Sequence, residues 1–492
     1  MKYVLAIDQG TTGTTALVID FRKRGRDAIV GRGYREFHQH FPGDGRVEHD
    51  LYEIWVSVES ACRDALISAG ISGHDVASIG ITNQRETTGL WRKDGTPVGR
   101  AIVWQDRRTA PLCAALKEKG LEPLFRARTG LVLDPYFSGT KIRWFLDEGL
   151  RDEATRGALR FGTIDTWLVW QLTGGKEHVT DVTNASRTLL FDLHRLAWDE
   201  ELCDHLTIPM SLLPRVVSSA EVVGKTHGVT FLPDGIPIAG IAGDQQAALF
   251  GQACFTPGMA KCTYGTGAFA LANVGSKPVM SSRGMLTTVA WKIGDSVSYA
   301  LEGSCFIAGA MVQWLRDGLM FFNSSAEVEQ LAAAVPDADG VVVVPALTGL
   351  GAPYWRPEAR GLISGISRRT NRSHIARAVL EGIALQVHAL LDAMRADSGL
   401  ALSLLRVDGG ASANNILMQF QADILQTTIH RSQVIETTAL GAAYLAAIGI
   451  GLFDNTQAIS EYWVLDRAYV PAMGQDEVQA RLLAWDKAVA AA

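Results

Sequence analysis

Short apolar runs alternate with polar, glycine-rich turns at the start of the chain. Residues 3–7 are continuously apolar, residues 16–19 form a second apolar run, and residues 8–15 between them are mostly glycine and threonine. Apolar runs of this length, bounded by turn residues, predict β-strands. We therefore expect a β-hairpin over residues 3–20.

Near the middle of the chain the pattern changes from strand to helix within a few residues. An apolar run over residues 236–242 enters a turn of small residues, Asp244 follows, and an apolar helix begins at Ala247. Gly240 and Gly243 have no Cβ atom, so backbone or a ligand can approach them closely. The stretch presents Asp244 at a strand-to-helix turn, where it either serves a site or simply caps the helix.

Helical spacing of apolar residues predicts further helices, and apolar runs that end in polar residues predict further strands. Ligands gather at strand ends in α/β domains, so the polar ends are candidate binding sites. We expect helices over 51–69, from 141, over 163–170, around 309–313, from 418 and over 439–453. Strands are expected over 76–82, 102–104, 341–345 and 404–407, and a further strand is expected to end near Leu271. Residues 181–187 are expected to form a loop.

Two of these strand ends carry side chains that suit a small polyol. Arg85 and Glu86 follow the strand at 76–82, Trp104 follows the next apolar run, and Tyr136 lies in a polar loop. An arginine donor and a carboxylate acceptor match hydroxyl groups, and aromatic faces match carbon atoms. The alternatives are a weak surface ion pair for Arg85 and Glu86 and a core position for Tyr136.

Two turns rich in glycine and hydroxyl groups suit phosphate. Such turns offer backbone N–H groups in a concave arrangement together with threonine O–H donors. The first turn is the hairpin tip, where Asp8 is placed to hold Mg²⁺ directly or through water. The second, Gly265-Thr266-Gly267, follows another apolar strand and repeats the first, which suggests an ancient duplication. Ordinary tight turns are the alternative for both.

Two further glycine-containing stretches are candidates for nucleotide binding. The pair Gly409-Gly410 between a strand and a helix lets a flat nucleoside lie against backbone, or it is a plain tight turn. Gly224-Lys225-Thr226 resembles the end of a phosphate-binding P-loop, but Ser219 stands where that motif requires glycine. A P-loop is therefore not encoded.

Composition limits the classes of function. The 492 residues are 47% hydrophobic and 20% charged, which is typical of a globular protein with two domains. A net charge of -6 argues against nucleic acid and anionic membranes as partners. The N-terminal apolar run is too short for a signal peptide, and residues 439–453 are too short to insert into a membrane. Six cysteines without metal-ligand spacing fit a reducing cytoplasm.

In this order the motifs resemble those of the glycerol kinases, within the FGGY carbohydrate kinase family of the actin and hexokinase superfamily. The resemblance covers nearly the whole chain. It implies an α/β fold with two ribonuclease-H-like, actin-like ATPase domains, residues 1–251 and 252–492, flanking a central cleft. Its most specific pieces are residues 8–12, 80–88, 134–141, 240–251, 263–267 and 407–411.

The resemblance also implies roles for individual residues. ATP and Mg²⁺ are the expected cofactors, with Asp8 and Asp244 near the metal. Asp244 is the expected general base for transfer of the ATP γ-phosphoryl group to glycerol, giving sn-glycerol 3-phosphate. The expected glycerol contacts are Arg85, Glu86, Trp104, Tyr136, Asp244, Gln245 and Phe269. The expected nucleotide contacts are Thr11, Thr12, Gly13, Thr15, Thr266, Gly309, Gln313, Gly410 and Asn414.

Two rival functions and two departures from the family remain at this stage. The rivals are phosphorylation of another small polyol or a ketose, and a nucleotide-switched binding module. Thr15 stands where many relatives have an arginine, so one cationic nucleotide contact is missing. Residues 225–235 lack the glycine run and arginine with which some bacterial relatives bind fructose 1,6-bisphosphate at a subunit interface. We expect a homo-oligomer, a dimer or tetramer, without that inhibition.

Overall fold

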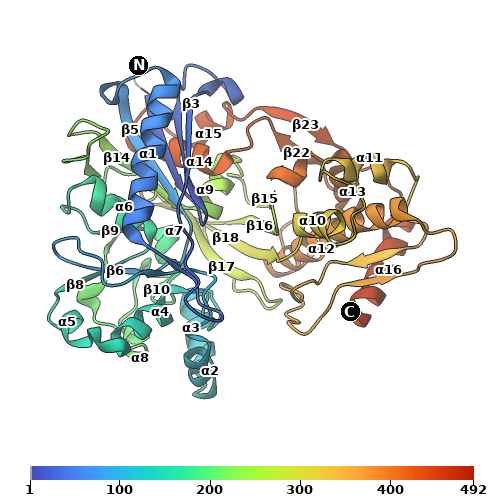
Figure 1. Ribbon diagram of the computed structural model, residues 1–492, viewed down its shortest axis with the longest axis horizontal. Helices are drawn as coiled ribbons and strands as arrows, with labels where there is room; N and C mark the ends of the chain where they lie inside the picture. The colour runs from blue at the N-terminus through green and yellow to red at the C-terminus, as the bar shows by residue number, and fades with distance from the viewer. Residues whose placement is uncertain (1–2) are drawn as a thin grey trace.

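Two mixed β-sheets, one in each half of the chain, organise the computed structural model (Figure 1). The structure describes residues 3–492, so Met1 and Lys2, with which the first expected domain begins, lie outside the described residues. The N-terminal half forms the lobe on the left of Figure 1, and the C-terminal sheet extends from the middle of the view into the lobe on the right. The chain therefore has the two-lobed α/β architecture that the sequence predicts.

The N-terminal sheet contains the predicted hairpin. β1 pairs antiparallel with β2, β2 pairs antiparallel with β3, and β1, β5 and β14 run parallel to one another. The carboxyl ends of β1, β5 and β14 therefore meet at one edge of the sheet. The strand order, over described residues, is β13 (Gly224–Lys225), β14 (Pro237–Gly243), β5 (Val76–Asn83), β1 (Tyr3–Gln9), β2 (Gly13–Ile19) and β3 (Ile29–Glu36).

The C-terminal sheet repeats this connectivity. β15 pairs antiparallel with β16 and parallel with β21, and β21 runs parallel to β22. A strand hairpin beside parallel strands thus occurs twice, as the repeated turn motif predicts. The strand order is β17 (Leu286–Ile293), β18 (Ser296–Cys305), β16 (Ala268–Gly275), β15 (Met259–Tyr264), β21 (Leu404–Asp408), β22 (Ile429–Ser432) and β23 (Leu465–Tyr469).

Short paired strands decorate both lobes. They are β4 (Glu48–His49) with β7 (Ala101–Ile102), β6 (Gly89–Arg92) with β8 (Leu159–Gly162), β9 (Val179–Asp181) with β12 (Arg215–Val217), β10 (Phe191–Asp192) with β11 (Ala197–Trp198), and β19 (Val342–Val344) with β20 (Leu362–Ser364). Because each pair is short and separate from the two large sheets, these strands extend the lobes without changing their topology.

Helices cover the sheets, and several begin at residues that the pattern predicts. α1 begins after Asp50, whose carboxylate accepts hydrogen bonds from the backbone N–H groups of Tyr52 and Glu53. The helices are α1 (Leu51–Ala69), α2 (Ala110–Glu118), α3 (Glu122–Thr129), α4 (Ser138–Phe145), α5 (Arg151–Thr155), α6 (Ile164–Leu172), α7 (Val182–Ala185), α8 (Glu200–His205), α9 (Asp244–Gly251), α10 (Gly309–Asp317), α11 (Glu327–Ala333), α12 (Arg372–Ser398), α13 (Asn415–Leu425), α14 (Thr437–Gly449), α15 (Thr456–Ser460) and α16 (Gln475–Ala491).

Helix α14 belongs to the C-terminal half of the chain but packs on the N-terminal lobe (Figure 1). Its Ala439, Leu440 and Ala443 share one hydrophobic cluster with Val4 and Ala6 of β1. The helix approaches α9 so closely that a Cβ atom at Gly441 would lie 1.9 Å from the carbonyl oxygen of Ala247. α14 therefore ties the two halves of the chain together through backbone contact.

Several expected boundaries are wrong. The strand expected at 102–104 is only the two-residue β7, and Trp104 lies in the turn after it. Residues 181–187 are not simply a loop, because Asp181 ends β9 and caps the short helix α7. The strand expected to end near Leu271 continues to Gly275, and the helices expected from 141 and 418 begin at Ser138 and Asn415.

The remaining expectations from composition concern membranes and cysteines. Among the described residues, no helix combines the length and apolar character needed to cross a membrane. All six cysteines are buried and free within the described part of the chain. Burial raises the pKa of the Cys113 thiol to about 11, so this side chain stays protonated and behaves as a small apolar residue.

Candidate active site

The end of β5 turns two charged residues into the interior. Arg85 and Glu86 are 3% and 1% exposed, so they do not form the surface ion pair that was the alternative. Glu86 adopts a positive φ of 61°, an uncommon conformation for a side chain of this size. The backbone N–H of Thr87 donates to the carbonyl of Arg85 at 2.7 Å, which closes this tight turn. Strain of this kind persists where the surroundings hold it, as at binding sites.

Arg85 and Glu86 belong to a buried cluster of charges. Arg85 donates two parallel hydrogen bonds to Glu302 of β18, from Nη1 to Oε2 at 2.6 Å and from Nη2 to Oε1 at 2.7 Å. Arg187 Nε donates to Glu86 Oε1 at 2.6 Å, and Arg187 Nη2 lies 3.2 Å from Glu302 Oε1. Burial opposes ionisation of Glu302, but Arg187 and Arg85 outweigh it and lower its pKa to about 2. Glu302 is therefore ionised in the folded protein, whereas burial raises the pKa of Glu86 against the opposing charges of Arg187 and Arg85.

Asp244 joins this cluster from the strand-to-helix turn. Its Oδ1 atom lies 3.1 Å from Nε of Arg85 and accepts a hydrogen bond from the backbone N–H of Gln245 at 2.7 Å. The N-cap of α9 is Gly243, and Asp244 is the first residue of the helix. The capping role that was its alternative is therefore wrong. Burial raises the pKa of the Asp244 carboxyl, while Arg85 acts in the opposite direction.

Trp104 and Tyr136 form an aromatic wall beside these charges. Their ring centroids are 5.6 Å apart in an edge-to-face arrangement, and the Arg187 guanidinium lies 5.4 Å from the Tyr136 ring. Burial, followed by the charge of Glu86, raises the pKa of Tyr136, so its hydroxyl stays protonated. The wall therefore offers carbon faces and a hydroxyl donor next to Arg85 and Glu86.

The hairpin tip lies against the same wall. Trp104 Nε1 donates to Thr11 Oγ1 at 2.9 Å, and Gln39 Nε2 donates to the Thr11 carbonyl at 2.8 Å. Gln39 Oε1 in turn lies 2.6 Å from His49 Nε2, and burial lowers the pKa of His49 to about 3. His49 is thus a buried, neutral support for the turn.

The other predicted residues of the tip differ in exposure. Thr12 is exposed and Gly13 is buried, while Thr11 and Thr15 are half-buried. Thr15 lies on β2 directly opposite Asp8 of β1. The position where many relatives carry an arginine therefore adjoins Asp8.

Asp8 and Asp244 form the carboxylate pair expected near a metal. Burial and the neighbouring charge of Asp244 raise the pKa of Asp8 from 3.8 to about 7. No group of three or more His, Cys, Asp or Glu side chains among the described residues has metal-binding geometry. Mg²⁺ nevertheless fits this pair, because it is commonly bound by one or two carboxylates with water and substrate phosphates completing its shell.

The second turn faces the start of α10. The Thr266 carbonyl accepts hydrogen bonds from the backbone N–H groups of Ala308 at 2.8 Å and Ala310 at 3.1 Å, and the N–H of Gly309 donates to the Gly265 carbonyl at 2.9 Å. These bonds fix the turn against the helix. Gln313 is exposed on the same helix, and Phe269 lies partly exposed on β16.

The remaining predicted nucleotide residues lie after β21. Gly410 is exposed and begins a short turn, and Asn414 Oδ1 caps α13 by accepting a hydrogen bond from the N–H of Leu417 at 2.9 Å. Asp408, at the end of β21, is bound by Gln252 Nε2 at 2.8 Å. The end of β21 is therefore tied to the segment that leaves α9.

Gln245 connects the N-terminal site residues to the C-terminal sheet. Its Oε1 atom accepts a hydrogen bond from Nζ of Lys261, which also donates to Thr263 Oγ1 at 3.0 Å. Lys261 is fully buried in β15, and burial lowers its pKa. This lysine therefore links the residue next to Asp244 with the strand that enters the second turn.

Sequence reasoning missed Arg187, Glu302 and Lys261. A signal was present for two of them, because Glu302 and Lys261 are single charges inside otherwise uncharged strands. Such residues are rarely buried unless they are paired. Arg187 carried no comparable signal, because it is the last residue of the predicted loop.

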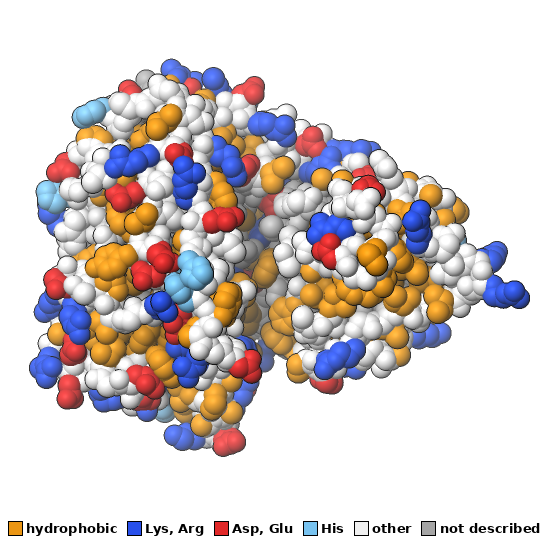
Figure 2. Space-filling view, viewed as in Figure 1, with side chains coloured by type: hydrophobic (Ala, Val, Ile, Leu, Met, Phe, Trp, Pro, Cys, Tyr) orange, Lys and Arg blue, Asp and Glu red, His pale blue; other side chains and the backbone are white. Residues whose placement is uncertain are grey.

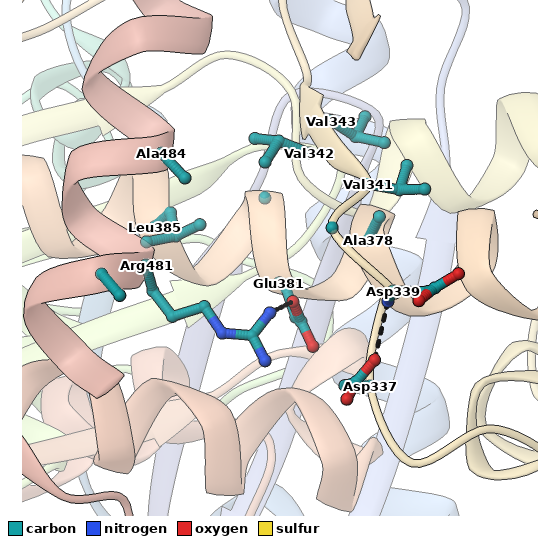
Figure 3. Close-up of a pocket in the computed structure, with 13 residues that line it drawn as sticks. Asp337, Asp339, Val341, Val342, Val343, Ala378, Glu381, Leu385, Arg481 and Ala484 are labelled. Carbon is teal, nitrogen blue, oxygen red and sulfur yellow. Dashed lines mark hydrogen bonds and ion pairs between the residues drawn. The ribbon is translucent and has the colours of Figure 1, made fainter. Parts of the chain in front are cut away.

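The site lies where the two lobes meet. Figure 2 shows the surface hollowed between the lobes. A separate cavity of about 360 Å³ lies in the C-terminal lobe between β19, α12 and α16 (Figure 3). Arg481 and Glu381 form an ion pair of 3.2 Å on its wall, and none of the predicted site residues lines it. The candidate active site is therefore the cluster in which residues of the N-terminal sheet contact Glu302 and Lys261 of the C-terminal sheet, and not this cavity.

Comparison with known proteins identifies the family. Residues 3–251 match the model for the N-terminal domain of the FGGY family of carbohydrate kinases, and residues 260–450 match the model for its C-terminal domain. The chain belongs to the FGGY family of carbohydrate kinases.

Relatives within the FGGY family match the chain over its full length. It is 58% identical to a glycerol kinase of Myxococcus xanthus and 55% identical to one of Symbiobacterium thermophilum, with 99% of this chain covered in both cases and 99% and 97% of those proteins. The crystal structure of Plasmodium falciparum glycerol kinase with ADP superposes with a TM-score of 0.94 at 37% identity, covering 100% of this chain and 98% of that one. The two-domain FGGY kinase fold is therefore established for this chain.

Proposed function

We propose that this FGGY kinase transfers the γ-phosphoryl group of ATP to a terminal hydroxyl of glycerol, giving sn-glycerol 3-phosphate and ADP. The observation that carries the proposal is the meeting of Arg85, Glu86 and Asp244 beside the Trp104–Tyr136 wall. Full-length identity of more than half to glycerol kinases supports it. We place the domain division at Gly251, where the first family model ends.

The polyol contacts follow from complementary chemistry. Arg85 donates hydrogen bonds to hydroxyl oxygens, and Glu86 accepts hydrogen bonds from hydroxyl groups. Gln245, next to Asp244, both donates and accepts. Trp104 and Tyr136, with Phe269 from the other half of the chain, shield the carbon atoms. A buried site whose polar groups match a few hydroxyls discriminates strongly against molecules that leave those groups unpaired.

Asp244 is the general base in this mechanism. As the glycerol oxygen bonds to the γ-phosphorus atom and the bond to the β-phosphate oxygen breaks, the hydroxyl proton moves to the Asp244 carboxylate. Its raised pKa favours proton acceptance, and Arg85 holds the carboxylate in place. Closure of the lobes excludes water, which is a competing acceptor.

The nucleotide phosphates are assigned to the two glycine- and hydroxyl-rich turns. Thr11, Thr12 and Gly13, with Thr15 beyond them, form the first turn, and Thr266 forms the second. Gly309, Gln313, Gly410 and Asn414 are assigned to the remainder of the nucleotide. Mg²⁺ at Asp8 and Asp244 would neutralise charge on the phosphates when bound.

The assigned partners are small molecules. Glycerol and ATP are the substrates, and neither nucleic acid nor an inserted membrane segment has a role. We propose a cytoplasmic location and a homo-oligomer, a dimer or tetramer.

A coupled assay over a polyol panel tests the proposed function. Initial rates of ADP formation are measured with glycerol, xylulose, ribulose and larger sugars as acceptors. The expected result is a kcat/KM for glycerol at least ~100-fold above that of any pentose or hexose. Comparable efficiency on a ketopentose would assign the chain to the rival sugar kinases, and the absence of transfer to any acceptor would favour a nucleotide-switched binding module.

A further inference from the structure

Two fully enclosed charged residues lie behind the proposed polyol contacts. Arg187 is 0% exposed and follows helix α7, and Glu302 is 3% exposed in β18 of the C-terminal sheet. Burying a charge is unfavourable unless it is paired. Their location at the proposed site therefore calls for a role beyond packing.

Arg187 contacts two of the proposed polyol residues directly. Its Nε atom donates to Glu86 Oε1 at 2.6 Å, and its guanidinium lies 5.4 Å from the ring of Tyr136. Within the described residues, its Nη1 and Nη2 atoms have no hydrogen-bond partner, so the bond to Glu86 is its main directional contact. That bond fixes the carboxylate of Glu86, whose backbone is already held at a positive φ.

Glu302 fixes Arg85 in the same way from the opposite sheet. Two parallel hydrogen bonds of 2.6 and 2.7 Å set the plane of the Arg85 guanidinium. The third nitrogen of that group, Nε, then lies 3.1 Å from Asp244 Oδ1. A rotation of Glu302 would therefore turn Arg85 away from Asp244.

The two residues also balance each other's charge. Arg187 Nη2 lies 3.2 Å from Glu302 Oε1. Arg187 therefore contacts both Glu86 and Glu302, and Arg85 contacts both Asp244 and Glu302. Without Arg187, Arg85 would be the one remaining arginine beside the carboxylates of Glu86 and Glu302, and a buried carboxylate that loses its partner takes up a proton or moves. A protonated Glu86 would lose part of its capacity to accept hydrogen bonds from hydroxyl groups.

We propose that Arg187 and Glu302 are a positioning pair that sets the affinity and selectivity of the polyol site by orienting Glu86 and Arg85. The proposal rests on the proposed function, because it assigns Glu86 and Arg85 to polyol hydroxyls. Both residues act on the reaction only through Glu86 and Arg85, so we expect the KM for ATP to be insensitive to this pair.

Steady-state kinetics of two conservative variants test this pair. Arg187→Lys keeps the charge but loses the planar guanidinium, and Glu302→Gln keeps the shape but loses the charge. Each variant is expected to raise KM for glycerol ~10- to 100-fold while KM for ATP stays within about twofold. The kcat/KM preference for glycerol over propane-1,2-diol, which lacks one hydroxyl, is expected to shrink by ~10-fold or more.

Arg108→Lys is the matched control. Arg108 has a side chain that is 3% exposed and ion-pairs with Asp106 and Glu48 at 2.8 Å, like the arginines of the cluster. It contacts none of the proposed polyol residues through these bonds. This variant is expected to lower the melting temperature while keeping the wild-type KM for glycerol and the preference over the diol.

The outcomes separate the positioning role from the function on which it rests. A wild-type protein that does not phosphorylate glycerol overturns the proposed function. A wild-type protein that does, with a folded Arg187→Lys variant whose glycerol KM and diol preference are unchanged, overturns only the positioning pair. If Arg187→Lys fails to fold, Glu302→Gln decides by the same readouts; if neither variant folds while Arg108→Lys does, the pair serves stability and the proposal is wrong.

Discussion

Two carboxyl groups of the site, Asp8 and Asp244, have different surroundings. Asp244 lies 3.1 Å from Arg85, which favours its ionised form against burial. Burial and the charge of Asp244 both oppose ionisation of Asp8, so its pKa rises to about 7. Burial therefore raises the pKa of both carboxyls, and Arg85 opposes this shift at Asp244.

Replacement of Asp8 by asparagine is expected to stabilise the free protein at high pH. The folded protein holds the Asp8 proton up to about pH 7, whereas the unfolded chain releases it near the ordinary pKa of 3.8. The contribution of Asp8 to the free energy of unfolding therefore falls as pH rises from about 4 to about 7, and it stays low above pH 7. Scanning calorimetry in EDTA is expected to show a melting-temperature advantage of Asp8→Asn that grows from about pH 5 to pH 8.

The exposed Asp44 provides the control for this effect. Asp44→Asn is expected to show no such growth with pH, and Mg²⁺ at saturation is expected to reduce the advantage of Asp8→Asn by stabilising the wild-type protein. A melting-temperature advantage of Asp8→Asn that is equal at about pH 5 and about pH 8 would contradict the raised pKa of Asp8.

Replacement of Asp244 by asparagine tests the general base. Asn keeps the size of the side chain but accepts no proton at neutral pH, so kcat is expected to fall ~10²- to 10⁴-fold. Because Gly243 caps α9, the melting temperature is expected to stay near the wild-type value. Turnover within a few-fold of wild type would refute the assignment, and a deficit that saturating Mg²⁺ abolishes would indicate a metal-binding role instead.

The sequence predicted the residues at strand ends but not their buried partners. Arg85, Glu86 and Asp244 follow apolar runs, so local pattern locates them. Arg187 and Glu302 meet these residues across separations of 101 and 217 positions, respectively. A pairing over such distances depends on the way the two sheets assemble, which hydrophobic periodicity does not specify.

At the scale of elements, the long strands and helices were predictable because their apolar periodicity is regular. β1, β5 and β14 each contain an apolar, largely buried run, and α1 has a clear cap and apolar stripe. β7 has only two residues, which is too short for a periodic pattern of apolar and polar residues. The helical nature of α14 was predictable, but its position on the opposite lobe was not.

Gly441→Ala tests the contact of α14 with α9. A Cβ atom at this position would lie 1.9 Å from the Ala247 carbonyl oxygen, so α14 must shift away from α9. We expect the free energy of unfolding to fall by about 1–3 kcal/mol, measured by denaturant titration. Gly474→Ala is the control, because a Cβ atom there meets nothing within 4 Å. Equal stability of the two variants would contradict the close packing of α14.

At the scale of the whole molecule, both repeated sheets contribute to one site. The proposed polyol residues lie mainly at strand ends of the N-terminal sheet, whereas Glu302 and Lys261 contact two of them, Arg85 and Gln245, from the C-terminal sheet. The repeated turn motif predicted the duplication, and the connectivity of the two sheets agrees with it. The site is therefore complete only when the lobes meet.

The segment at residues 225–235 determines the expected response of turnover to a sugar bisphosphate. Asp234 is exposed and accepts hydrogen bonds from the backbone N–H of Gly228 at 2.7 Å and from His227 at 2.8 Å. A carboxylate in this position repels a sugar bisphosphate, and the segment lacks arginine. We expect no inhibition of turnover by ~1 mM fructose 1,6-bisphosphate at saturating substrates. Clear inhibition at that concentration, seen as a lower initial rate, would contradict this expectation.

The most direct test of the central claim is the fate of the γ-phosphoryl group of ATP. The protein is incubated with ATP, Mg²⁺ and glycerol, and the products are followed by phosphorus NMR, with the configuration read by an enzyme specific for sn-glycerol 3-phosphate. We expect one molecule of sn-glycerol 3-phosphate for each ADP formed. Release of inorganic phosphate without a phosphorylated glycerol, or formation of the opposite isomer, would contradict the account.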